Sequence, residues 1–188
     1  MSAFEFFSVA LSFVLGLGVT RLLLGFVYVF RMRERLSPHW IPLVWGTSIF
    51  VYQLQFWWAV FELNTALGQW THIAFITLMG HTLLLFVAGA LVLPAQEYSD
   101  HDRLLDYFDE DGRWSILALA AYAALSFWTN WFLFGTSPLS PVGAIVGLIL
   151  VLALVGFFAR PRWLQGAMAI AFLATAVLAY VALTPAQY

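Results

Sequence analysis

One arginine, Arg21, lies within an apolar run rather than in a polar connection between runs. The run extends from Phe4 to Phe30, and Arg21 lies ten residues before Arg31, or about 15 Å along a helix. A guanidinium at that depth in a bilayer costs about 2.5 to 3.5 kcal/mol on insertion scales, so it needs a partner. Because its planar fork of donors suits a carboxylate or another anion, a bound anionic ligand is one chemistry that this residue offers.

Three further polar side chains reach a comparable depth in other apolar runs: Gln53, Gln55 and His81. No carboxylate does so, because Glu5 and Glu62 both lie near the ends of their runs. Arg21, Gln53, Gln55 and His81 are therefore the candidate ligand-binding residues. The alternative is structural: the two glutamines, backbone carbonyls or a lipid phosphate satisfy the arginine.

Redox, metal and catalytic chemistry find little support in the residue pattern. A haem at His81 requires a second axial ligand, and the other histidines, His39, His72 and His101, lie near run ends or in a polar segment. The chain has no cysteine and contains neither an HExxH nor a GxSxG motif. We therefore expect no cofactor, no metal site, no catalytic residue and no enzymatic activity.

The composition assigns the chain to the polytopic α-helical membrane proteins. Hydrophobic residues make up 63%, charged residues only 10%, and the mean hydropathy is +0.88. A formal charge of −2 gives no reason to expect a nucleic-acid partner. We predict an all-α bundle of six transmembrane helices in one domain, residues 1–188, with short loops and no soluble domain; the spans are about 4–30, 40–61, 72–93, 114–134, 141–158 and 163–183.

The arginines predict the orientation of this bundle. All eight basic residues are arginines, and seven of them fall in alternate connections, within 31–39, 95–113 and 159–162. Short loops that retain positive charge stay in the cytoplasm, so both termini are predicted outside. The expected location is the cytoplasmic (inner) membrane of a bacterium, with the lipid bilayer as the main partner.

Aromatic residues allow two interpretations. The second run contains Phe56, Trp57 and Trp58, and the fourth echoes them with two aromatic pairs, Phe127-Trp128 and Trp131-Phe132. Interfacial belts of tryptophan account for them, and a platform for a quinone, pigment or sterol is the alternative.

Small residues indicate where helices approach closely: Gly16, Gly18, Gly25, Gly143 and Gly147. Such patterns serve packing within one chain as readily as dimerisation, so a homo-oligomer and a membrane partner subunit both stay open. Polar residues concentrate in the first four runs, which predicts a polar interior there and a bracing role for the last two. The acidic segment 95–113 is expected to be a solvated loop, a docking segment for a basic partner or a short amphipathic helix on the inner surface.

The opening segment SVALSFVLGLGVTRLLLG resembles the first helix of a group of small uncharacterised bacterial integral membrane proteins, with GLGxTxLL as the shared feature. That group carries no known activity, so the resemblance implies nothing further about function. The residues themselves favour a protein that binds or transports a small anionic solute or lipid through the interior of the first four spans. The alternative is a non-catalytic accessory or scaffold subunit of a membrane complex.

Overall fold

The computed structural model of this chain describes residues 3–66, 71–94, 103–133 and 135–183, and these residues are almost entirely helical. The long helices are α1 (Ala3–Arg31), α2 (Trp40–Ala66), α3 (His72–Val92), α5 (Trp114–Phe132), α6 (Pro141–Phe158) and α7 (Arg162–Leu183). A short helix, α4 (Leu104–Tyr107), continues into a π-helical turn, η1 (Phe108–Gly112), ahead of α5. No strand occurs among the described residues, so the predicted all-α class is confirmed.

The helix boundaries follow the predicted spans because the apolar runs end in capping or helix-breaking sequences. The Thr71 side chain accepts a hydrogen bond from the Ala74 N–H at 3.2 Å and caps the start of α3. Ser140 does the same for α6 through the Gly143 N–H at 3.1 Å, with Pro141 as the first helical residue. Only α2 departs clearly from its predicted span, since it continues five residues beyond 61 to Ala66.

Five of the long helices are long and apolar enough to cross a membrane: α1, α3, α5, α6 and α7. Helix α2 has the length, at 27 residues, but its glutamines and many aromatic residues lower its apolarity. Both glutamines bond inside the bundle: Gln53 Nε2 donates to the Leu85 carbonyl at 3.2 Å, and Gln55 Nε2 to the Ala176 carbonyl at 2.6 Å. The polar groups that set α2 apart are thus turned toward other helices.

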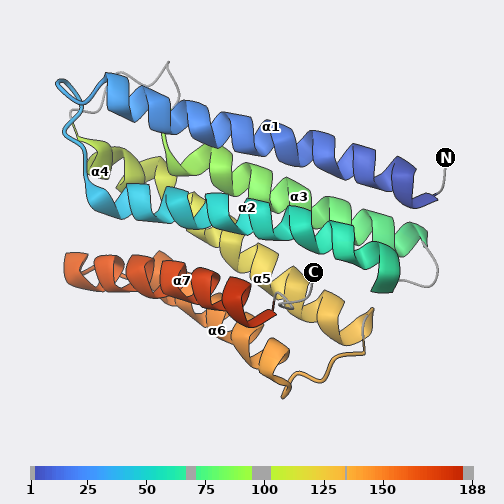
Figure 1. Cartoon of the computed structure of the whole chain (residues 1–188). Helices are drawn as coiled ribbons and strands as arrows, with labels where there is room; N and C mark the ends of the chain where they lie inside the picture. Colours follow the sequence, from blue (N-terminus) through green and yellow to red (C-terminus); the bar gives the residue numbers. More distant parts are fainter. Residues whose placement is uncertain (1–2, 67–70, 95–102, 134, 184–188) are drawn as a thin grey trace.

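The helices form two groups: α1, α2 and α3 make one, and α6 and α7 make the other (Figure 1). Helix α5 and the contact of α2 with α7 join the two groups. Helices α1 and α3 run side by side in the same direction, with Phe7 stacked on Phe75 at 4.6 Å near their N-termini. Helix α2 packs on α1, α3 and α7, whereas α5 packs on α3 and α6, and α6 packs on α7. Trp45 of α2 and Phe172 of α7, both buried, join the groups with their rings 4.9 Å apart.

The arginine-bearing segments meet at one end of the bundle, the end away from the N-terminus (Figure 1). The Leu104 N–H donates to the Ser37 carbonyl at 3.2 Å, which joins the segment after α1 to the start of α4. Arg162 pairs with Asp109, its Nη1 lying 2.8 Å from Oδ1, and Arg113 donates to the Ala159 carbonyl. Segments that are far apart in the sequence therefore meet at one arginine-bearing end.

The acidic segment 95–113, predicted as a loop or a surface helix, packs its apolar side chains into the core over its described residues. Leu104, Tyr107 and Phe108 are buried, and η1 contacts both α3 and α5. Helix α3 ends at Val92, and α4 and η1 pack against this end, where the Tyr107 hydroxyl bonds the Leu91 carbonyl. The short helix that one interpretation predicted is present as α4, and it is amphipathic, with Leu104 and Tyr107 buried in the bundle and Asp106 exposed. Residues 95–102 of that segment lie outside the described residues.

Candidate functional site

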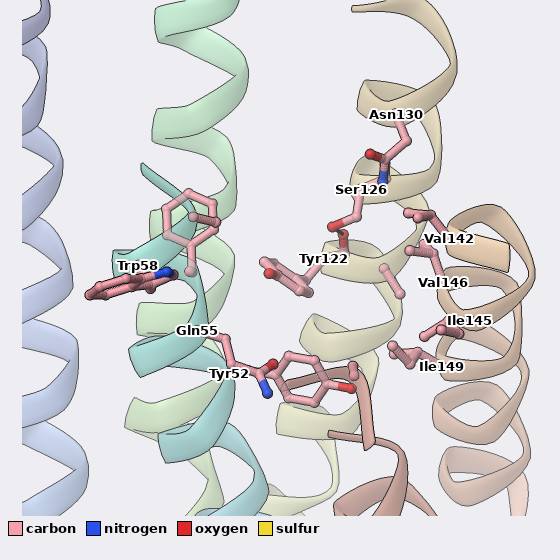
Figure 2. A pocket seen from close by; sticks show the side chains of 14 residues that line it. Tyr52, Gln55, Trp58, Tyr122, Ser126, Asn130, Val142, Ile145, Val146 and Ile149 are labelled. Atoms are coloured by element: carbon pink, nitrogen blue, oxygen red, sulfur yellow. Dashed lines mark hydrogen bonds between the residues drawn. The ribbon is translucent and has the colours of Figure 1, made fainter. Parts of the chain in front are cut away.

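A pocket of about 280 Å³ opens between α2, α5, α6 and α7 (Figure 2). It extends from the middle of the bundle toward the end away from the arginines, since its residues come from the middle and C-terminal parts of α2 and α5 and from the N-terminal half of α6. It forms where α2 and α5 are not packed directly on each other but are bridged by aromatic rings. None of its lining residues is charged; they are Tyr52, Gln55, Phe56, Trp58, Ala59, Tyr122, Ala123, Ser126, Asn130, Val142, Ile145, Val146, Ile149 and Ala179.

The helical repeat explains why these residues share one pocket. Tyr122, Ser126 and Asn130 follow one another at intervals of four on α5, so their side chains lie on one face of the helix. Tyr52 and Phe56 on α2 have the same spacing, and α6 contributes an apolar stripe from Val142 to Ile149. Figure 2 shows the α2 and α5 residues facing one another with the α6 stripe alongside.

The polar groups of the pocket differ in whether they have a hydrogen-bond partner within the described chain. Ser126 Oγ donates to the Tyr122 carbonyl at 2.9 Å, and Asn130 Nδ2 donates to the Ser126 carbonyl at 3.0 Å. Gln55 donates to α7, as described above. The Tyr52 hydroxyl is different: Tyr52 is buried, 5% exposed, and its hydroxyl has no hydrogen-bond partner among the described residues. An unpaired buried hydroxyl costs about 1 to 3 kcal/mol, so something outside the described chain is expected to bond it.

Aromatic rings form one wall of the pocket. The Tyr122 ring meets Tyr52 at 6.1 Å and Phe56 at 6.3 Å, both edge to face. Behind Phe56 lies His81, stacked on it at 5.6 Å and 4% exposed. His81 Nδ1 lies 2.8 Å from the Thr77 carbonyl, which can only accept, so Nδ1 carries the proton. His81 therefore supports the aromatic wall and does not line the pocket itself.

Arg21 is bonded to the end of α3. Its Nη2 atom lies 3.0 Å from the Ala90 carbonyl and 3.4 Å from the Leu93 carbonyl. The last carbonyls of a helix have no partner within it and carry the negative end of the helix dipole. The Tyr107 hydroxyl bonds a third, Leu91, at 2.9 Å. Arg21, on α1, thus caps the C-terminal end of α3. Backbone carbonyls are among the partners that the structural interpretation of Arg21 predicted.

Gln53 occupies a notch between two glycines on α1 and α3. A Cβ atom at Gly18 would lie 3.1 Å from Gln53 Nε2, and one at Gly89 would lie 3.0 Å from it. Gln53 is fully buried, and its Oε1 atom has no partner among the described residues. The four candidate residues therefore do not form one site: Gln55 lines the pocket, and Arg21, Gln53 and His81 have separate surroundings.

The glycines predicted from the sequence to lie at helix contacts differ in their surroundings. Gly25 faces Leu93, where an added Cβ would come within 2.8 Å of the leucine Cβ, so α1 and α3 touch there. Gly143 faces the Pro138 carbonyl just before its own helix. Cβ atoms at Gly16 and Gly147 would have no neighbour within 4 Å among the described residues.

Tyr52 and Tyr122 were absent from the sequence-based candidates. The polar stripe of α5 at intervals of four, facing a matching stripe on α2, is the signal that could have located them. Of the aromatic residues considered as a platform, Phe56 and Trp58 line the pocket, whereas Trp57 and Trp128 are 46% and 39% exposed and do not.

No family model, no curated protein and no solved structure shows a significant match to this chain.

Proposed function

We propose that this chain is a six-span integral membrane protein that binds a small, lipid-soluble ligand in the pocket between α2, α5, α6 and α7. Five apolar helices support membrane insertion. Helix α2 is the sixth span in this proposal, because it packs on α1, α3 and α7 and bonds its glutamines within the bundle.

The single observation that carries the proposal is the composition of the pocket. An open pocket between four helices combines apolar and aromatic walls with a few uncharged polar groups, as small-molecule sites do. Trp58 and Ala59 line it and are exposed, so they stand at its mouth. A mouth on the helix surface admits a ligand from the lipid phase.

The arginine-bearing end of the bundle supports an orientation. The positive-inside rule assigns this end to the cytoplasm, so the pocket extends from the middle of the membrane toward its outer side. A bacterial inner membrane is the location that this arrangement suits.

A site for an anion at Arg21 is less well supported than the pocket. The positive charge of Arg21 already meets the negative end of α3, with a hydrogen bond of 3.0 Å to Ala90. The polar interior expected from the first four spans is also replaced in this proposal, since α6 and α7, the helices predicted only to brace it, supply part of the pocket wall.

A pocket-filling variant tests the proposal. Ala123 is buried and lines the pocket, so Ala123→Phe should occupy much of its volume; Ala144→Phe, on the exposed face of α6, is the matched control. Small molecules extracted by organic solvent from each purified protein are compared by mass spectrometry. We expect a compound that accompanies wild type and Ala144→Phe but not Ala123→Phe, provided all three elute as folded protein. If no compound follows this pattern, the proposal loses its support.

A further inference from the structure

The unpaired hydroxyl of Tyr52 indicates the kind of ligand that the pocket takes. We infer that the ligand is a neutral, ring-bearing molecule with a hydrogen-bond acceptor such as a carbonyl or ether oxygen, and that Tyr52 donates to this acceptor. The inference rests on the proposed function, and it adds the ligand class and the residue that determines specificity.

The position of the Tyr52 ring is fixed by packing. It meets Tyr122 at 6.1 Å and Phe172 at 5.3 Å, so the hydroxyl cannot swing to another partner without breaking these contacts. Figure 2 shows the ring extending across the pocket from α2 toward the α6 side. A phenol that is held in place and unpaired is a preorganised donor, because no protein bond has to break before it binds the ligand.

The ligand must supply an acceptor for this O–H group. A phenolic hydroxyl pairs best when its proton is donated, and leaving the proton unbonded in an apolar site carries the main penalty. The two side-chain amide nitrogens of the pocket are donors, not acceptors, and both are already bonded, that of Gln55 to the Ala176 carbonyl and that of Asn130 to the Ser126 carbonyl. An oxygen acceptor on the ligand therefore completes the site.

The absence of charge in the lining excludes ions as ligands. In the part of the chain that the structure describes, no arginine, histidine, aspartate or glutamate lines the pocket, so neither an anion nor a cation would find a counter-charge there. Bringing an unpaired charge into such a site is far costlier than bringing a neutral polar group. Arg21 does not contribute, since it lies against the end of α3.

The size of the pocket and its aromatic walls favour a ligand that contains rings. An apolar cavity of about 150 Å³ accommodates a benzene molecule, so about 280 Å³ suits a molecule with two rings. Phe56, Trp58 and Tyr122 offer ring faces and edges against which such a molecule can pack.

Benzophenone is a suitable probe, because it has two rings, one carbonyl acceptor and no charge, and on illumination it attaches to neighbouring C–H groups. Saturable labelling of purified protein is mapped to peptides, and its concentration dependence gives the affinity. Diphenylmethane, which lacks the carbonyl, serves as a competitor, and 4-benzoylbenzoate is the anionic counterpart. The variants are Tyr52→Phe and, as the matched control outside the pocket, Tyr28→Phe.

We expect wild-type labelling by benzophenone on α2, α5 or α6 peptides that line the pocket. We expect Tyr52→Phe to bind benzophenone about tenfold more weakly than wild type, because it lacks one hydrogen bond. Its affinity for diphenylmethane should be unchanged, and so should the affinity of Tyr28→Phe for benzophenone. Equal benzophenone affinity in Tyr52→Phe and wild type would overturn the role of Tyr52 while the proposed function stands. Preference of the pocket for 4-benzoylbenzoate would overturn the neutral class. If wild type shows no saturable labelling of pocket peptides, both proposals fail.

Discussion

Replacing Arg21 with methionine should destabilise the bundle, because Arg21 caps α3 across a helix interface. The substitution removes the bond to the Ala90 carbonyl at 3.0 Å and the longer one to Leu93 at 3.4 Å. A hydrogen bond from a charged donor contributes about 1.5 to 3 kcal/mol, and the interaction with the helix dipole adds about 0.3 to 2 kcal/mol.

The cost of placing an arginine in the membrane does not offset this loss. When helices separate within a membrane, each helix stays inserted, so Arg21 keeps its insertion cost in the separated state and loses its partners as well. Counting the 3.0 Å bond and the dipole, we expect Arg21→Met to lower the free energy of unfolding by about 2 to 5 kcal/mol. Arg21→Lys should recover part of this, since it keeps the charge but not the fork.

Reversible unfolding of the purified protein in mixed micelles measures the effect. Arg33→Met is the matched control, because Arg33 is exposed and bonds only within its own turn, to the Phe30 carbonyl at 3.0 Å, so its loss should change stability by less than about 0.5 kcal/mol. An Arg21→Met protein as stable as the Arg33→Met control would refute the capping role. It would also favour the hypothesis that Arg21 binds an anionic ligand.

Three further predictions concern packing, pH and topology. Gly18→Val should cost about 1 to 3 kcal/mol, because its side chain displaces Gln53 and meets the Phe86 backbone, whereas Gly16→Val, with no neighbour within 4 Å among the described residues, should be nearly neutral in the same unfolding assay. Burial, and then the nearby Arg162, lower the pKa of His39, whose Nδ1 accepts the Ile41 N–H at 3.3 Å. Below about pH 6.5 the unfolded chain therefore binds more protons than the folded one, so the free energy of unfolding falls as the pH drops. His39→Gln should flatten that part of the plot of stability against pH. In this cysteine-free chain, Ser37→Cys should resist an impermeant thiol reagent in intact cells and Ser137→Cys should react; the reverse pattern would contradict the orientation.

The helices could be predicted from the sequence because their ends depend on local chemistry. Apolar runs of about 20 residues end at capping residues such as Thr71 and Ser140, and these signals do not require knowledge of any neighbour. The grouping of arginines in alternate connections was likewise visible, and the structure brings those segments to one end.

The pocket could not be predicted in the same way, because it depends on how helices pack. The α6 residues Val146 and Ile149 that wall it are indistinguishable in sequence from residues that face lipid. Tyr52 looks like any buried tyrosine until its surroundings show that its hydroxyl has no partner. Arg21 was recognised as unusual, but its partners lie about 70 positions further along the chain, at the end of α3.

The central claim, that this pocket binds a neutral ligand through Tyr52, is tested most directly by a high-resolution density map of the protein purified from its own membranes in mild detergent. We predict non-protein density between α2, α5 and α6, with an atom about 2.6 to 3.2 Å from Tyr52 Oη. A pocket closed by its own side chains, with the Tyr52 hydroxyl bonded to another group of the protein, would contradict the claim.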